Sequence, residues 1–276
     1  ANCLGGVILG MRHTLSLPIL IGDRNKIAAA AHELGEDIAG CSVIHVETHR
    51  DAAALGVKLV NEGRAKALMK GYLHTDELLG QVVKSDGGLR IGRRLSHVFV
   101  FDVPGQKHLI FVTDAAINIA PDLETKVDIV QNAIDLARTL GIETPKVGVL
   151  SAVETVNPKI PSTLDAAALS KMAERGQIRN GLVDGPLAMD NAIDMNAART
   201  KGIKSLVAGQ ADILVAPNLE SGNMLAKELT FVAHAEAGGV VIGANCPIIL
   251  TSRSDDDKAR LASCAIAALY AERKDR

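Results

Sequence analysis

The fold class follows from one stretch, residues 97–150, which reads HVFVFDVPGQKHLIFVTDAAINIAPDLETKVDIVQNAIDLARTLGIETPKVGVL. Two apolar runs, 97–103 and 108–112, flank Pro104-Gly105, a dipeptide that favours a turn, so we expect an antiparallel hairpin. Residues 122–140 place apolar side chains at steps of 4, 3, 4 and 3, which is one face of a helix, and Gly141 is a natural stop. Another strand is predicted at 147–150.

The same alternation of short β-branched runs and longer Ala/Leu-rich segments extends in both directions from this stretch. Further strands are predicted at residues 42–46, 67–69, 181–183, 213–216, 239–242 and 247–250. Further helices are predicted at residues 25–34, 51–61, 75–83, 163–175, 187–198, 221–237 and 255–273. Alternation of this kind is typical of βαβ units, so we expect an α/β fold with mostly parallel, mixed sheets.

Composition limits the possible partners. The chain has 276 residues, 47% of them hydrophobic, with no Trp, four Phe and two Tyr, so an aliphatic core is expected. Its formal net charge is −2, whereas nucleic acids and anionic membranes attract a basic surplus. We therefore expect neither partner.

Cysteine spacing and hydropathy limit the compartment. The four cysteines form no CxxC pair, which argues against a disulfide scaffold and a local zinc site. The longest uncharged run, residues 237–252, has 16 residues and contains Gly, Asn and Pro, whereas a membrane span needs about 20 apolar residues. A cytoplasmic protein with reduced thiols is expected.

Several common catalytic motifs are absent from the sequence. No GxGxxG follows a predicted strand and there is no GxxxxGK[ST], which disfavours a Rossmann-type dehydrogenase and a P-loop NTPase. HExxH and GxSxG are also missing, so zinc protease and α/β-hydrolase chemistry are disfavoured.

Polar residues follow many of the predicted strands, where open α/β sheets place their ligands. Each of them alone is more often a turn or cap residue than a ligand. The set comprises Lys70-Gly71, Asp114, Ser151, Asp184-Gly185, Asn218 with Glu220, and Ser252-Arg253.

The most informative of these segments is PIILTSRSDDDK, residues 247–258. Ser254 with Asp257 fits a helix start of the capping-box type, but that does not account for Ser252 and Arg253. A hydroxyl, a guanidinium and carboxylates in one loop suit an acyl-phosphate substrate and a general base.

Several blocks in order resemble the phosphate acetyltransferase/phosphate butyryltransferase family. The resemblance extends from about residue 17 to about residue 272. The blocks are LMKGYLHTDELL (68–79), RRLSHVFVFDVP (93–104), FVTDAAINIAPDL (111–123), SAVETVNPKIPST (151–163), GLVDGPLAMDNAI (181–193), ADILVAPNLESGNMLAKELTF (211–231) and GGVVIGANCPIILTSRSDDD (238–257). The Met-Lys-Gly and Asn-Pro-Lys forms look more like the butyryltransferase branch, and like the transferase part of fusions with an enoyl-CoA hydratase-like module. No such module lies within the 276 residues, so no hydratase activity is implied.

The resemblance implies a fold, an assembly and a reaction. The implied fold has two α/β/α lobes, like those of isocitrate and isopropylmalate dehydrogenases, with the active site in the cleft. The first lobe would be residues 1–118 with 250–276, and the second 119–249. A homodimer or larger assembly is implied, as is reversible acyl transfer between phosphate and coenzyme A without a further cofactor or metal.

The resemblance also implies roles for particular residues. Ser252 and Arg253 would hold the acyl phosphate and stabilise the oxyanion, and Asp255 or Asp257 would be the base for the coenzyme A thiol. Arg94, with Arg93 as a neighbouring candidate, would bind phosphate. Further residues would line the cleft without separable roles: Lys70, Gly71, Asp114, Asp184, Glu220 and Asn223.

Two alternatives stay open at this point. One is a metal- and NAD-dependent decarboxylating dehydrogenase of the same fold, for which the only acidic cluster is residues 255–257, beside Arg253. The other is a non-catalytic sensor of coenzyme A or acyl phosphate, which would keep the same binding residues.

Overall fold

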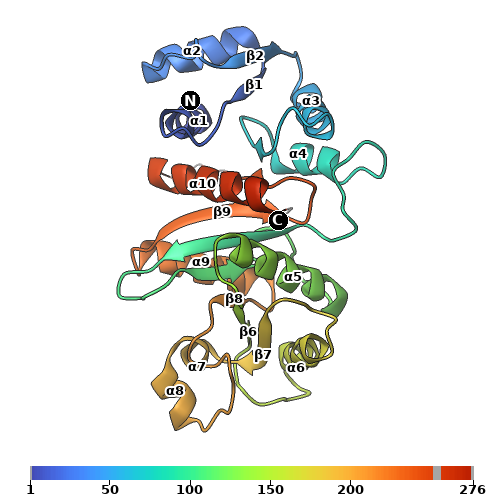
Figure 1. Cartoon of the computed structure of the whole chain (residues 1–276), viewed down its shortest axis with the longest axis vertical. Coiled ribbons are helices and arrows are strands. Elements are labelled where there is room, and N and C mark those ends of the chain that lie inside the picture. Colours follow the sequence, from blue (N-terminus) through green and yellow to red (C-terminus); the bar gives the residue numbers. More distant parts are fainter. Residues whose placement is uncertain (1, 251–255, 275–276) are drawn as a thin grey trace. The chain divides into compact units, whose positions relative to one another are not determined.

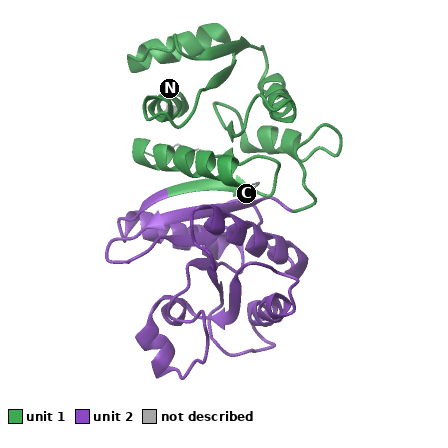
Figure 2. Ribbon diagram, in the orientation of Figure 1, with its two compact units in different colours: residues 1–93, 238–276 green, residues 94–237 purple. Residues whose placement is uncertain are grey.

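The computed structural model describes residues 2–250 and 256–274. The chain divides into two compact units (Figures 1 and 2): unit 1 comprises Ala1–Arg93 and Gly238–Arg276, and unit 2 comprises Arg94–Ala237. In the part of the chain that is described, no helix is both long and apolar enough to cross a membrane.

Unit 2 contains five neighbouring strands of a mixed sheet. Their order is β4 (Ser96–Asp102), β5 (Ile110–Thr113), β8 (Ile213–Val215), β6 (Lys146–Leu150) and β7 (Leu182–Leu187). The β4–β5 pair is antiparallel, and the other pairs are parallel. The hairpin predicted around Pro104-Gly105 is therefore confirmed, and Gly105 has the positive φ of 86° that its turn requires.

Helices cover both faces of these strands. They are α5 (Leu123–Thr139), α6 (Pro161–Glu174), α7 (Met189–Ile193), α8 (Met195–Thr200) and α9 (Leu219–Phe231). Helix α5 contacts β4, β5 and β8, whereas α7, α8 and α9 share an apolar cluster with the side chains on the opposite face of the strands. Unit 2 is thus an α/β/α arrangement in which the helices that follow parallel strands begin at one edge of the sheet.

Helix α5 forms as its sequence predicts. Asp122 is the N-cap, and its carboxylate accepts a hydrogen bond from the Thr125 backbone N–H at 2.8 Å. The predicted apolar face is buried, with Val130 and Ile134 fully covered. Two polar side chains on the helix, Lys126 and Asn132, are also buried, and both bear on the site described below.

Unit 1 contains two small groups of strands. β1 (Ile19–Gly22) pairs in parallel with β2 (Ser42–His45). β10 (Ile248–Ile249) lies between β3 (Leu68–Met69), with which it is parallel, and β9 (Glu236–Ile242), with which it is antiparallel.

The helices of unit 1 are α1 (Asn2–Arg12), α2 (Arg24–Leu34), α3 (His49–Asn61), α4 (Thr75–Val82) and α10 (Asp257–Arg273). Helix α1 packs on α10. Gly6 lies so close to Arg260 that a Cβ at this position would come within 2.8 Å of the Arg260 Cδ.

The predicted and the observed elements differ in four places. Helix α1 and strand β1 had not been predicted. The helix predicted at 187–198 is two short helices, because the Asp194 side chain caps α8 by accepting from the Ala197 N–H at 2.7 Å. The helix predicted at 221–237 ends at Phe231, and residues from Glu236 onward belong to β9.

The predicted lobe boundaries, at 118/119 and 249/250, stay a prediction. The two compact units divide the chain at 93/94 and at 237/238. This division places Arg94 in unit 2, together with the helices and loops that surround it.

Candidate active site

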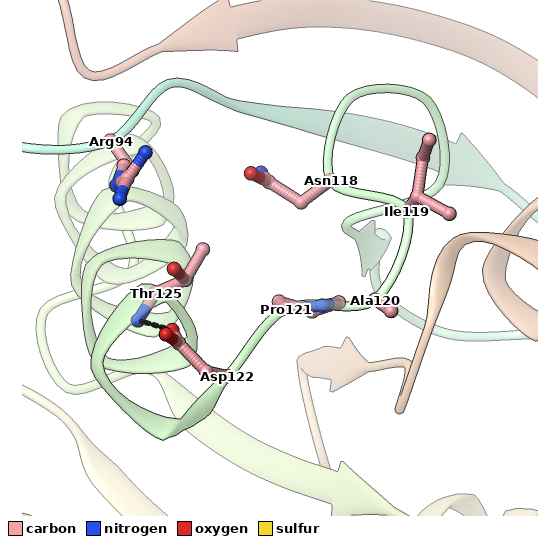
Figure 3. A pocket seen from close by; sticks show the side chains of 7 residues that line it. All are labelled: Arg94, Asn118, Ile119, Ala120, Pro121, Asp122 and Thr125. Atoms are coloured by element: carbon pink, nitrogen blue, oxygen red, sulfur yellow. Dashed lines mark hydrogen bonds between the residues drawn. The ribbon is translucent and has the colours of Figure 1, made fainter.

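A cavity of about 170 Å³ lies in unit 2 beside the start of α5 (Figure 3). Seven residues line it: Arg94, Asn118, Ile119, Ala120, Pro121, Asp122 and Thr125. We call this cavity the Arg94 pocket. In Figure 3 the Asn118 amide extends from its loop towards the side of the pocket that holds Arg94 and α5, whereas Ile119 points away.

The main chain at Arg94 is held from both sides by α5. The Arg94 N–H donates to Asp128 Oδ2 at 2.9 Å, and the Arg94 carbonyl accepts from Asn132 Nδ2 at 3.0 Å. Asn132 is fully buried and also hydrogen-bonds the Ser96 hydroxyl at 2.9 Å. Side-chain hydrogen bonds to a loop backbone restrict the conformations of that backbone. These two bonds therefore fix the position of the Arg94 main chain, from which the side chain extends.

The loop that follows β5 is organised by Asp114. This carboxylate is 3% exposed and accepts four hydrogen bonds. The donors are the N–H groups of Ala116 (2.9 Å), Ile117 (3.0 Å) and Asn118 (3.1 Å) and the Asn118 side-chain Nδ2 (2.6 Å). Asn118 Nδ2 also donates to the Leu95 carbonyl at 2.8 Å, which links this loop to the segment that carries Arg94.

The charge at the rim of the pocket is mixed. Hydrogen bonds from the Thr125 hydroxyl and N–H lower the pKa of Asp122, and the Arg94 charge acts in the same direction. Asp122 is therefore ionised at neutral pH. The pocket presents one guanidinium group together with one carboxylate.

A second cavity of about 340 Å³ adjoins the same loop. Its lining includes residues at or just before the starts of α5, α6 and α9, and the full list is Ala120, Pro121, Lys126, Pro161, Ser162, Asp165, Pro217 and Asn218. The Lys126 side chain is 7% exposed and its Nζ lies 2.6 Å from Asp165 Oδ2. The hydroxyls of Ser162 and Ser151 are 2.8 Å apart.

Comparison with known proteins identifies the family. The family described as Phosphate acetyl/butaryl transferase matches residues 45–268. A phosphate acetyltransferase of Rhizobium meliloti is 59% identical over 271 residues, which are 98% of this chain and 86% of the relative. The chain belongs to this family. A phosphate butyryltransferase of Clostridium acetobutylicum is 44% identical over 93% of this chain and 85% of its own length.

Solved structures confirm the predicted fold class. A branched-chain phosphotransacylase from Enterococcus faecalis superimposes with a TM-score of 0.80 at 32% identity, covering 94% of this chain and all of that one. A 4-hydroxythreonine-4-phosphate dehydrogenase from Burkholderia phymatum matches with a TM-score of 0.54 at 15% identity, covering 96% and 93% of the two chains. The second likeness shows the dehydrogenase-like fold alone, so it gives no support to the dehydrogenase alternative.

Among the predicted site residues that the structure describes, Arg94 is the one that lines the Arg94 pocket. Arg93 is not among the lining residues. None of the described residues accepts a hydrogen bond from the Arg94 guanidinium group. Asp114 does not line the pocket, because its carboxylate is turned into the loop that it organises.

Three other predicted site residues, Asn223, Glu220 and Asp184, belong to unit 2. Asn223 on α9 donates to the Ala115 carbonyl at 3.1 Å, so it holds the same loop that Asp114 organises. Glu220 is exposed in the first turn of α9. Asp184 lies within β7, and its Oδ1 accepts from the Gly185 N–H at 2.8 Å. None of these three lines either cavity.

The remaining predicted residues belong to unit 1. Lys70 and Gly71 directly follow β3, and Lys70 Nζ donates to the Leu73 carbonyl at 3.3 Å. Asp257 is the first residue of α10, and its Oδ1 accepts from Arg260 Nη1 at 3.1 Å. Ser252, Arg253 and Asp255 lie outside the described residues. Among the residues that are described, no group of three His, Cys, Asp or Glu side chains is placed to hold a metal ion.

The sequence reasoning missed Asn118, Thr125, Lys126 and Asp165. Lys126 carried a usable signal, because it occupies the buried side of α5 and a Lys is rarely buried without a partner. Asn118 carried none, because it is one polar residue among several in a loop.

His97 is a buried polar residue beside the site. It is 3% exposed, and its Nδ1 has no hydrogen-bond partner. Burial lowers the pKa of His97 to about 4, although the nearby Asp114 charge raises it in part. The imidazole is therefore neutral at physiological pH.

Proposed function

We propose that this member of the phosphate acetyl/butyryl transferase family transfers a short acyl group reversibly between coenzyme A and inorganic phosphate. The reaction is acyl-CoA + phosphate ⇌ acyl phosphate + coenzyme A, with acetyl as the first candidate acyl group and butyryl as the second. The observation that carries the proposal for this chain is the Arg94 pocket. A guanidinium group that has no accepting partner among the described residues faces a cavity, and its main chain is anchored by Asp128 and Asn132.

Arg94 is proposed to bind the phosphate or phosphoryl group. A guanidinium group offers paired N–H donors whose geometry matches two oxygens of a phosphate, and it stays charged at any pH the enzyme meets. The cavity is large enough for a tetrahedral oxyanion, because 170 Å³ is several times the roughly 30 Å³ that a water molecule occupies in the liquid.

The proposed chemical step is direct attack of the coenzyme A thiolate on the carbonyl carbon of the acyl phosphate. The new C–S bond forms, the C–O bond to phosphate breaks, and phosphate leaves with the electron pair. Ser252 and Arg253 are proposed to hold the acyl phosphate and to stabilise the negative charge on the carbonyl oxygen. Asp255 or Asp257 is proposed to take the thiol proton. Lys70, Gly71, Asp184, Glu220 and Asn223 remain proposed substrate-binding residues, and Asp114 is proposed to contribute by organising the loop that follows β5.

The proposed setting follows the family. The enzyme is proposed to act in the cytoplasm as a homodimer or larger homo-oligomer, with coenzyme A and phosphate as substrates and with no further cofactor or metal.

The proposal is tested by coenzyme A release from acyl-CoAs of two to six carbons in phosphate buffer. Arg94→Lys should raise the KM for phosphate by about tenfold or more, because paired hydrogen bonds to a charged group are lost. Arg93→Lys is the matched control and should change this KM far less. Absence of coenzyme A release with every acyl-CoA would refute the proposed reaction. An effect at Arg93 in place of Arg94 would show that the phosphate site is wrongly assigned.

A further inference from the structure

The orientation of the Asn118 amide is fixed by its surroundings. Nδ2 donates to the Leu95 carbonyl at 2.8 Å and to Asp114 Oδ2 at 2.6 Å. Both partners can only accept, so rotating the amide by 180° would place Asn118 Oδ1 against two other oxygens. Asn118 Oδ1 therefore points away from the Leu95 carbonyl and the Asp114 carboxylate.

The side to which Asn118 Oδ1 points is the Arg94 pocket, which Asn118 lines (Figure 3). No described residue donates a hydrogen bond to Asn118 Oδ1. Among the described residues, the pocket therefore offers an acceptor that has no donor and that a ligand can satisfy. The pocket has two further acceptors, the Asp122 carboxylate and the oxygen of the Thr125 hydroxyl. The Thr125 hydroxyl donates its own hydrogen to Asp122.

A ligand that fits this lining needs both a negative charge and an O–H group. The charge suits Arg94, and the O–H group suits Asn118 Oδ1. Inorganic phosphate meets both conditions at neutral pH, because each of its ionic forms there keeps at least one O–H. Sulfate is a dianion with no proton and meets only the first condition. The phosphoryl group of an acyl phosphate in its dianionic form also has no O–H.

We infer that Asn118 contacts inorganic phosphate by accepting a hydrogen bond from its O–H group, and that Asp114 is a positioning residue that fixes the Asn118 amide for this contact. The inference rests on the proposed function, since it takes the Arg94 pocket as the phosphate site. Asp114 acts through Asn118, because its own carboxylate is 3% exposed and its oxygens are taken by four N–H donors.

The experiment compares phosphate with sulfate. KM for phosphate and Ki for sulfate as a competitor are measured in the coenzyme A release assay. For a variant without turnover, equilibrium dialysis of labelled phosphate with sulfate as the competitor gives the ratio of the two dissociation constants. The wild-type enzyme should prefer phosphate over sulfate by about tenfold, the upper range of a single uncharged hydrogen bond.

Two variants test the two residues separately. Asn118→Ala removes the acceptor, and Asp114→Asn takes away the carboxylate that holds Nδ2, so the Asn118 amide can turn its N–H group to the ligand. Both should reduce the preference for phosphate over sulfate to about twofold or less. Asn132→Ser is the matched control. It loosens the Arg94 main chain without touching the acceptor, so it should weaken both anions alike and keep their ratio. Thermal melts show which variants are folded.

The outcomes separate this inference from the proposed function. If Arg94→Lys leaves phosphate binding unchanged while coenzyme A is still released, the Arg94 pocket is not the phosphate site, and both that assignment and the role of Asn118 fail. If no acyl-CoA gives coenzyme A release, the proposed reaction itself fails. If Arg94→Lys weakens phosphate but Asn118→Ala and Asp114→Asn keep the wild-type ratio, only the role of Asn118 is refuted. A wild-type enzyme that binds sulfate as tightly as phosphate refutes that role as well.

Discussion

The buried His97 should make the stability of the protein depend on pH in a defined window. The folded-state pKa is about 4 and the ordinary value is 6.5, so the unfolded chain binds this proton more readily than the native protein. Stability is then fully present above pH 6.5 and is lost as the pH falls towards 4. At about 1.36 kcal/mol for each pH unit, the total loss is about 3 kcal/mol, of which about 2 kcal/mol is already lost at pH 5.

The assay is chemical denaturation of the wild type and of His97→Gln at pH values from 7.5 to 4.5. Carboxylates also titrate over part of this range, so the informative quantity is the difference in the free energy of unfolding between the two proteins. Between pH 7.5 and pH 5, the free energy of unfolding of the wild type should fall by about 2 kcal/mol more than that of His97→Gln. His108→Gln, an exposed position on the same hairpin, is the control and should show no such change. Parallel stability curves for wild type and His97→Gln would refute the assignment of a buried neutral imidazole.

Three further predictions concern the ion pair, the thiols and the acyl-phosphate loop. Asp165→Asn should destabilise unit 2 by about 2 kcal/mol in urea denaturation, because it leaves the 7% exposed Lys126 side chain without its partner. Replacement of all four cysteines by Ala should keep most of the turnover, since burial raises the pKa of Cys246 to about 12 and leaves it a poor nucleophile. Arg253→Lys should lower kcat by about 10²–10³ with little change in Tm.

Each of these predictions has a control, a companion variant or an outcome that would contradict it. Glu174→Gln removes the exposed partner of Lys171 on the same helix as Asp165 and should change the stability very little, since both side chains of that pair are more than half exposed. An acyl-enzyme detected by mass spectrometry and lost with one cysteine would contradict the direct-attack mechanism. Ser252→Ala should show a smaller loss of turnover than Arg253→Lys, because a neutral donor contributes less than a charged one. Turnover near the wild-type value for Arg253→Lys would show that this loop is not the site.

Local sequence signals predicted much of the fold. The hairpin of β4 and β5 depends on a Pro-Gly turn between two apolar runs, and α5 depends on a capping Asp and a regular apolar face. Both signals lie within the segment that they shape. The order of the strands in the sheet is set by packing between distant segments, and it was not predicted.

Helix α1 shows why the rest could not be predicted. Its sequence, NCLGGVILGMR, contains three glycines, each of which disfavours a helix by about 1 kcal/mol relative to Ala. Contacts with α10 reverse this preference. Gly6 lies where a Cβ would meet the Arg260 side chain, so a glycine that weakens the isolated helix is what lets the two helices approach. Only the packed structure reveals that gain.

The site shows the same limit at the level of single atoms. The position of Asp114 after a strand predicted a polar residue near the ligand, and the structure turns that carboxylate into the loop, where it accepts four hydrogen bonds. The group that reaches the cavity is Asn118, four residues on, and it does so because Asp114 and the Leu95 carbonyl occupy both of its N–H groups. A sequence pattern names residue types and their spacing, but it does not show which acceptor is left unused after folding. At this site the unused acceptor, opposite an arginine, is the feature that separates a phosphate with a proton from an anion without one.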